Sequence, residues 1–218
     1  VRGDVEQGFT EADLIHESYH ETKMVHQGYL EPTAAVASAG PDGKINIWVS
    51  TQHTFGLRKL VSDLFEIPLD EINVIPLEIG GGFGGKVNAM LESLAVGLSK
   101  KAKRPVKLVM DRAEVFRATG PTAPAHITVK TGTKKDGTLT ACYAEIVIDT
   151  GAFTGAPVAG SFVASFGAYK VANLKLDGYE VVTNKPGVQA YRAPGGTQAG
   201  FAVEAHMVKS VFSTHNFL

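Results

Sequence analysis

The residues with the clearest chemical meaning lie in the stretch GGGFGGK, residues 80–86, in which five of seven positions are glycine. An apolar run, 74–79, precedes this stretch and a helical pattern, 89–98, follows it. Glycine has no Cβ, so such a loop can take positive φ values and bring its backbone N–H groups close to a ligand. If the loop opens onto a helix, its free amides and the helix dipole favour the same negatively charged group. The stretch therefore predicts a site for an anion or an oxo group, whereas a simple strand-to-helix turn would need only one or two glycines.

A second glycine-rich loop lies more than a hundred residues later, in the sequence YRAPGGT, residues 191–197. Each loop joins a predicted strand to a predicted helix and carries a basic residue. Two such loops that face each other could hold a polar, anionic cofactor through backbone amides, with Arg192 adding positive charge and a fork of donors. Gln52, just after a predicted strand end, could add a neutral side-chain donor at the same rim.

A phosphate-binding motif competes with this interpretation. Residues 80–86 fit the pattern G-x-x-x-x-G-K, and an apolar run ending at Asp111 imitates the aspartate that completes such a site. Position 87 is valine, however, where that motif requires serine or threonine to bind Mg²⁺. Without the hydroxyl the metal loses a ligand, so we interpret the match as chance.

A zinc motif competes as well. His16-Glu17-x-x-His20 fits the pattern H-E-x-x-H, and His26 lies where the third histidine of an extended metalloprotease motif would lie. That motif needs a helix to bring its first two histidines onto one face, and it needs glycine where Lys23 stands. The mixed pattern over 12–26 predicts a strand instead, which would place the three histidines too far apart for one ion. A zinc metallopeptidase remains one alternative function, and a non-catalytic structural or oligomerising fragment is another.

The composition fits a globular protein, since 44% of the 218 residues are hydrophobic and 20% are charged. A net charge of −1 argues against a broad nucleic-acid surface. No apolar run approaches the ~20 residues of a membrane span, and the sequence has no signal-peptide pattern. Cys142 is the only cysteine, so the chain can form neither an internal disulfide nor a thiolate cluster. We therefore expect a cytoplasmic protein without nucleic-acid or membrane partners.

The periodicity predicts an α+β fold, with mixed layers of β-hairpins and helices and two glycine-rich strand-to-helix loops. Turn residues at 40–43 and 134–137 indicate two hairpins. Thr51 could cap a helix through residue 65, whose predicted apolar face consists of Leu57, Leu60, Val61 and Leu64. The other predicted elements are strands over 12–26, 72–79, 106–110 and 174–183, a short helix within 151–167, and helices over 89–98, over 111–117 and from 198 onward.

Six motifs occur in a characteristic order: Tyr29-Leu30-Glu31-Pro32, Ser50-Thr51-Gln52, the glycine loop 80–86, Met110-Asp111-Arg112-Ala113-Glu114, the stretch 190–198 and Phe201-Ala202-Val203-Glu204. Together they resemble the molybdopterin-binding subunit of the xanthine dehydrogenase and aldehyde oxidase family. The resemblance extends from about Gly3 to Met207 at family-like spacing, which makes it far more specific than either competing motif.

This resemblance implies a hydroxylase that oxidises an aldehyde or an N-heterocycle, with water as the oxygen source and molybdenum-molybdopterin as the cofactor. The residues that it assigns to the cofactor are Gln52, Gly81, Gly82, Phe83, Gly84 and Arg192. Among them, Gln52 would donate to an oxo ligand of molybdenum and Phe83 would lie near the metal. The resemblance assigns to this chain no catalytic residue and no protein ligand of the metal.

Three departures from purine-hydroxylating members argue against xanthine as the substrate. Position 87 is valine, as in aldehyde-oxidising relatives, where purine hydroxylases have glutamate. Pro194 stands where those enzymes place a ring-stacking aromatic residue. No arginine lies between Arg117 and Arg192, a stretch in which they carry one that orients the substrate.

The family's general base, a glutamate in a C-terminal motif, has no match here, and neither has the second half of the cofactor site. We expect residues 1–11 to be a lead-in from a preceding domain, 12–207 to be the N-terminal half of the molybdopterin-binding domain, and 208–218 to be a divergent tail. Alone, the chain should be inactive and should need the remainder of its molybdenum subunit. Iron–sulfur clusters and FAD should lie on other domains or subunits, because one cysteine cannot ligate a cluster. Apolar surface left open by the missing half should make the chain self-associate as a homo-oligomer.

Overall fold

A computed structural model describes the backbone of residues 1–215 and the side chains of residues 1–210. The chain folds as two compact units. The first unit comprises residues 1–25, 122–188 and the chain from 192 onward, and the second comprises 26–121 and 189–191. Most of the second unit is thus a single insertion, in sequence, between the first strand of the first unit and the rest of that unit.

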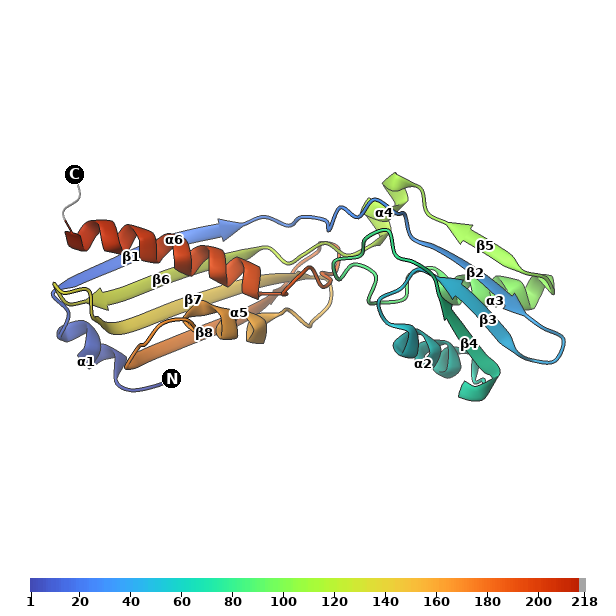
Figure 1. Ribbon diagram of the computed structural model, residues 1–218, viewed down its shortest axis with the longest axis horizontal. Coiled ribbons are helices and arrows are strands. Elements are labelled where there is room, and N and C mark those ends of the chain that lie inside the picture. Colours follow the sequence, from blue (N-terminus) through green and yellow to red (C-terminus); the bar gives the residue numbers. More distant parts are fainter. Residues whose placement is uncertain (216–218) are drawn as a thin grey trace. The chain divides into compact units, whose positions relative to one another are not determined.

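Figure 1 shows the helices and strands. In chain order the helices are α1 Val5–Thr10, α2 Thr54–Phe65, α3 Glu92–Ala102, α4 Arg112–Ala118, α5 Val158–Ser165 and α6 Gly196–His215. The strands are β1 Leu14–Thr22, β2 Ala34–Ala39, β3 Ile45–Val49, β4 Ile72–Pro76, β5 Val106–Val109, β6 Ala125–Thr133, β7 Leu139–Gly151 and β8 Asn173–Val182, and a 3₁₀ turn spans Leu69–Glu71.

The first unit is a four-stranded sheet with the order β1-β6-β7-β8, in which only the β7–β8 pair is parallel. α6 lies over β1 and β6, while α5 packs against α6 and against β7 and β8 (Figure 1). Ile127, Ile146 and Ile148 on the sheet are buried against small residues of the helix, Ala199 and Ala202. Small side chains on α6 let the helix approach the sheet closely, so the branched residues of the strands fill the core.

The second unit is also a four-stranded sheet, with the order β4-β3-β2-β5. β2 and β3 form an antiparallel hairpin, and β3 continues through α2 into β4, which lies parallel to it. α3 packs on β2, and α2 packs on β4. The core between sheet and helices is made by the buried side chains Ala37, Ile47, Val61, Ala95 and Val96. Gln52 follows the C-terminal end of β3 by three residues, so the sheet positions this residue.

The α+β class predicted from the sequence is confirmed, including both hairpins and the short helix within 151–167. Two helix predictions were partly wrong. α3 begins at Glu92 and not at 89, and Thr51 does not cap α2, which begins at Thr54 without a side-chain cap. The Thr51 hydroxyl instead donates to the carbonyl of Lys86 (3.1 Å). Thr51 therefore joins the end of β3 to the glycine loop.

The predicted apolar face of α2 is only half buried by the second unit. Leu57 and Val61 lie in the core, whereas Leu60 and Leu64 are 44% and 59% exposed. The helix thus carries more apolar surface than its own unit covers.

The ends of the chain contain regular structure. α1, within the predicted lead-in 1–11, is capped by the Asp4 side chain and packs against β7. α6 continues beyond residue 207 to His215, and the last three residues of the predicted tail lie outside the described residues. The boundaries of the predicted domain remain predictions. In the described part of the chain, no helix is long and apolar enough to cross a membrane.

Candidate cofactor site

The glycine loop, residues 80–86, lies in the second unit between β4 and α3, but it does not open directly onto the helix. The Gly85 N–H donates to the carbonyl of Gly82 (2.7 Å), and the Val87 N–H donates to that of Gly84, so the loop closes on itself. Residues 87–91 then separate it from α3. The expectation that a helix dipole contributes to this loop is therefore wrong, and the donors that the loop offers are its own amides.

At several of the loop glycines, neighbouring atoms of the chain leave no room for a Cβ. A Cβ on Gly82 would lie 2.6 Å from the Gln52 Oε1 atom. A Cβ on Gly84, whose φ is +103°, would lie 2.6 Å from the carbonyl oxygen of Ala190. Gly80 and Gly85 are equally close to side chains of the second unit. Four of these positions have no room for a side chain, so this loop needs more than the one or two glycines expected for a plain turn even without a ligand.

A buried ion pair closes the base of the loop. The Lys86 side chain is only 2% exposed, and its Nζ donates to Glu31 Oε2 beside the Tyr29 ring. The same Glu31 oxygen accepts the Gly80 N–H at 2.9 Å, so one carboxylate holds both ends of the loop. Burial alone raises the pKa of Glu31, but hydrogen bonds from Lys86, Gly80 and Ser50 outweigh it and hold the pKa below its ordinary value. Lys86 is thus committed to Glu31 and cannot serve as the phosphate-binding lysine of a nucleotide site.

Gln52 is oriented by the loop. Its Oε1 accepts the N–H groups of Gly84 (2.9 Å) and Lys86 (3.2 Å), and its own backbone N–H donates to the Lys86 carbonyl (2.9 Å). Two N–H donors fix the side-chain oxygen, so the other end of the amide is the NH₂ group. No described residue accepts a hydrogen bond from Nε2, and Gln52 is exposed. The residue therefore presents two free N–H donors beside the loop.

The loop itself offers three further donors. The N–H groups of Gly80, Gly84, Gly85 and Lys86 all have acceptors, whereas those of Gly81, Gly82 and Phe83 have none among the described residues. Phe83 has a positive φ of 53°, rare for a residue with a side chain, and its ring is half exposed. Strained backbone with consecutive free amides is typical of an anion-binding nest. Gly81, Gly82, Phe83 and Gln52 thus form one cluster of donors within the second unit.

The other predicted site residue, Arg192, belongs to the first unit. It is exposed and has no ion pair among the described residues. Here a glycine loop does open onto a helix, as predicted: α6 starts at Gly196, whose N–H donates to the carbonyl of Ala193 (2.9 Å). Ala190, two residues before Arg192, is part of the second unit and accepts a hydrogen bond from Gln27 (2.8 Å). A clamp formed by both loops remains a prediction.

The first two histidines of the zinc motif lie on a strand, as the mixed pattern predicts, and not on the helix that a peptidase requires. His16 and His20 are on β1, and His26 belongs to the second unit. The described residues contain no group of three His, Cys, Asp or Glu side chains that could hold a metal ion. The geometry that would allow Glu17 to act as the base of a zinc site is therefore absent from β1.

A further histidine, which was not predicted from the sequence, lies beside β1 and bonds Ser18. His206 on α6 is fully buried; its Nδ1 bonds the Ser18 hydroxyl (2.6 Å) and its Nε2 bonds the Thr131 hydroxyl (2.8 Å). Ser18 also bonds His20 at 2.8 Å. Burial, together with positive charge on His16, His20 and Lys209, lowers the pKa of His206 to about 4. Its only signal in the sequence is a polar residue near the apolar positions Ala202 and Val203 of a predicted helix, which does not reveal a partner.

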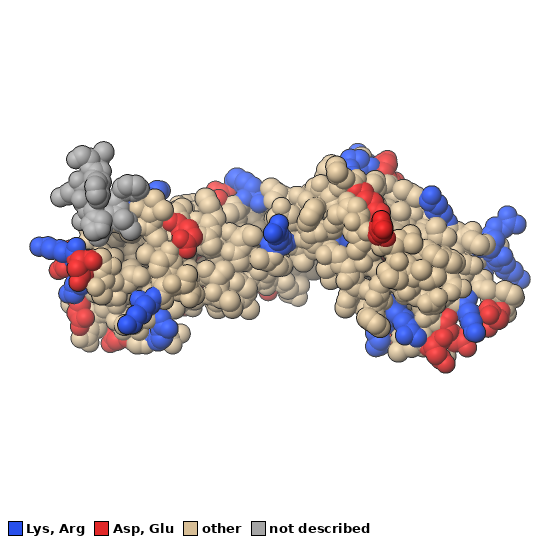
Figure 2. Space-filling model, in the orientation of Figure 1, with Lys and Arg blue, Asp and Glu red and all other residues tan. Residues whose placement is uncertain are grey.

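Charges do not suggest a different kind of site. On the face shown in Figure 2, basic and acidic side chains are intermingled, and neither sign forms a continuous field. This face of the described chain shows no continuous basic stripe (Figure 2).

Comparisons with known proteins identify the family of the chain. The family described as molybdopterin cofactor-binding domain matches residues 1–210. The chain belongs to this family. The resemblance inferred from the sequence motifs is thereby confirmed, and the family places the chain among parts of xanthine dehydrogenase and aldehyde oxidase-type enzymes.

Individual relatives agree with the family match. A probable xanthine dehydrogenase subunit of Bacillus subtilis is 35% identical over 208 residues, which are 94% of this chain and 28% of that protein. The nicotinate dehydrogenase large molybdopterin subunit of Eubacterium barkeri is 32% identical over 94% of this chain and 49% of its own length. The solved aldehyde oxidoreductase of Desulfovibrio gigas superimposes with a TM-score of 0.89 at 26% identity, over 98% of this chain and 24% of that one. The chain thus spans half or less of the length of each of these proteins.

Proposed function

We propose that this molybdopterin cofactor-binding domain is the N-terminal part of a molybdenum hydroxylase that oxidises an aldehyde or an N-heterocycle with water as the oxygen source. Relatives of both types support this substrate range: one is named for nicotinate and another for aldehydes. We further propose that the chain is inactive alone. It spans only part of each relative, and no motif in its sequence matches the family's general-base glutamate.

The observation that carries the proposal is the donor cluster. Three consecutive amides, of Gly81, Gly82 and Phe83, and the Nε2 of Gln52 have no acceptor among the described residues. A molybdopterin cofactor is polyanionic and rich in oxo and phosphate oxygens, so it is the acceptor that such donors fit. The donor residues of the second unit are therefore compatible with this cofactor.

In this proposal the protein supplies binding and orientation. Gln52 would hold the cofactor through Nε2. Its Oε1 is not free for this role, because it accepts hydrogen bonds from the Gly84 and Lys86 amides. The free loop amides would bind further oxygens without competition from other acceptors. When bound, the molybdenum cofactor supplies two-electron oxidation of the substrate carbon. Arg192 would add a positive charge from the first unit, and Gly84 would let the loop approach Ala190.

Xanthine is a poor candidate for the substrate. Val87 has no carboxylate to interact with a purine, and Pro194 has no ring to stack on one. A smaller or less polar substrate, such as an aldehyde, needs neither group. We therefore place aldehydes ahead of purines in the proposed substrate class.

The test is elemental analysis for molybdenum and zinc on the chain purified alone and together with the products of neighbouring genes. Molybdenum in the assembled sample only is the expected result. Stoichiometric zinc in the isolated chain would overturn the proposal in favour of the histidine motif on β1, and no metal in either sample would leave a structural fragment.

A variant links the metal content to the donor cluster. In the assembled sample, Gln52→Ala should lower the molybdenum content or the aldehyde oxidation rate at least about tenfold, as expected when a charge-assisted donor is lost from a preorganised site. Gln7→Ala is the matched control, because Gln7 is an exposed glutamine on α1 in the other unit. Equal activity of Gln52→Ala and the control would count against the assignment of Gln52.

A further inference from the structure

The second unit contains a cavity far from the donor cluster. Its volume is about 640 Å³, and it is lined by Ala39, Gly40, Pro41, Gly43, Ile45, Ile67, Lys100 and Lys103. It lies at the β2–β3 turn, where β3 begins, whereas Gln52 follows the opposite end of the same strand. The two places are thus separated by the whole length of β3, roughly 16 Å at ~3.3 Å per residue.

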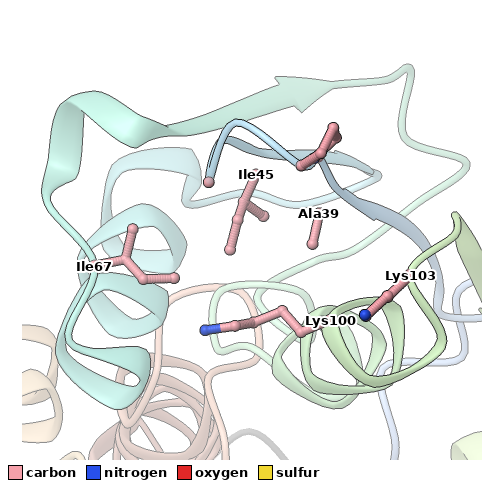
Figure 3. Close-up of a pocket in the computed structure, with 8 residues that line it drawn as sticks. Ala39, Ile45, Ile67, Lys100 and Lys103 are labelled. Atoms are coloured by element: carbon pink, nitrogen blue, oxygen red, sulfur yellow. The ribbon is translucent and has the colours of Figure 1, made fainter.

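The interior of the cavity is apolar. Ile45 and Ala39 point into it from the hairpin, Ile67 approaches from the segment after α2, and Lys100 and Lys103 lie along the end of α3 (Figure 3). The turn contributes Gly40 and Gly43 to the lining. Gly40 N–H donates to the Lys44 carbonyl (2.8 Å) and Gly43 N–H to that of Gly40 (3.2 Å). These two N–H groups of the turn are therefore satisfied, and the side chains of Ala39, Ile45 and Ile67 offer a ligand hydrophobic contact.

The charged groups that line the cavity are both positive. Neither Lys100 nor Lys103 forms an ion pair within the described residues; Lys100 Nζ lies 5.2 Å from the centre of the Phe65 ring. No carboxylate of the described chain is among the lining residues, but two adjoin the turn: Asp42 accepts the Lys44 N–H, and a Glu71 oxygen lies 3.6 Å from the Cβ position of Gly43. Lysines near a helix C-terminus are stabilised by the helix dipole, which is one reason for lysines to occur at this position. Lys101 can make the same interaction with the dipole of α3, however, and it is not among the residues that line the cavity.

We propose that this cavity is a binding site for a small organic anion, specifically a monocarboxylate with an apolar body. The apolar walls would take the body, and the two ammonium groups would take the carboxylate. Ligand sites of about 300–1,000 Å³ that combine hydrophobic walls with a few polar groups are typical for small molecules. The site is independent of the proposed molybdenum chemistry, since none of its lining residues belongs to the donor cluster.

The experiment titrates the full 218-residue chain with octanoate by calorimetry and by methyl NMR. Saturable binding with a Kd below about 1 mM is expected, with shifts at Ile45 and Ile67. The double variant Lys100→Gln/Lys103→Gln should weaken binding at least about tenfold, equal to ~1.4 kcal/mol. The charge-matched control Lys101→Gln/Lys135→Gln removes two exposed lysines that do not line the cavity and should leave the affinity unchanged.

Two further probes test the two halves of the ligand. Octanol lacks the charge and inorganic phosphate lacks the apolar body, so each should bind more weakly than octanoate. The proposal is overturned if octanoate shows no saturable binding, if the control variant loses as much affinity as the cavity variant, or if phosphate binds as tightly as octanoate. None of these outcomes depends on whether the chain binds molybdenum.

Discussion

At the scale of single residues, the glycine loop is shaped by steric contact as much as by backbone freedom. Gly84→Ala should lower the free energy of unfolding by about 2–4 kcal/mol, because the new Cβ combines the strain of a positive φ with a contact 2.6 Å from the Ala190 carbonyl. Gly43→Ala is the matched control in the same unit: its φ is +85°, but its Cβ would meet only a Glu71 oxygen, at 3.6 Å. Denaturant unfolding should show a clearly smaller loss for the control, and equal losses would mean that strain alone accounts for Gly84.

Some of the candidate site residues could be predicted from the sequence, and others could not. Gln52 and the loop residues Gly81–Phe83 were found because amide donors and glycine have a fixed chemical meaning. The reason for the glycines at 82 and 84 was not visible, since it depends on Gln52 and Ala190, which lie about 30 and 106 positions away in the chain. His206 was missed for the same reason. A single buried polar residue says nothing about its partners until the fold brings Ser18 and Thr131 beside it.

At the scale of elements, α6 is held on the first sheet by a neutral histidine, so its attachment should depend on pH. His206 has a pKa of about 4 in the folded chain against 6.5 ordinarily. The unfolded chain therefore binds the proton first, and stability that is complete above pH 6.5 is lost as the pH falls toward 4, by at most about 3.4 kcal/mol at 1.36 kcal/mol per pKa unit. Asp149, with a pKa of about 2, acts only at lower pH.

Amide hydrogen exchange on β1, β6 and α6 measures this effect directly. Protection should fall between pH 6.5 and pH 4, once the exchange rates are corrected for their intrinsic dependence on pH. His206→Gln keeps a neutral partner for the two hydroxyls and should flatten the dependence, while His53→Gln, on an exposed residue of the other unit, should not. An unchanged slope in His206→Gln would show that other groups control the docking of α6.

Helices and strands were predictable from the sequence where their own unit buries one of their faces. The strand at β1 followed from its mixed pattern, in spite of a motif that is helical in other proteins, and pairing with β6 explains why the strand forms. Boundaries were less predictable. α3 starts later than expected because the chain just before it bonds outside the helical pattern: the Met90 N–H donates to the Glu92 carboxylate (2.6 Å), and the helix begins at Glu92.

At the scale of the whole molecule, apolar residues that the sequence assigns to helix faces are left uncovered. Leu60 and Leu64 on α2 are 44% and 59% exposed, and Leu94 and Leu98 on α3 are 59% and 38% exposed. Helices of a folded domain normally bury such faces, and large exposed apolar patches mark contact surfaces. We name these four residues the leucine surface. Because the chain spans only part of each relative, we expect the isolated chain to cover this surface by self-association.

Sedimentation velocity at several concentrations tests this prediction on the full chain. The isolated chain should form oligomers whose size grows with concentration, and Leu60→Glu/Leu64→Glu should shift the population toward monomer, because a charge buried in an apolar contact costs several kcal/mol. Phe153→Glu/Val163→Glu is the control: these residues are 72% and 80% exposed but belong to the first unit. A chain that stays monomeric at every concentration would contradict the prediction. Equal dissociation by both double variants would place the contact outside the leucine surface, since the two variants share only their added charge.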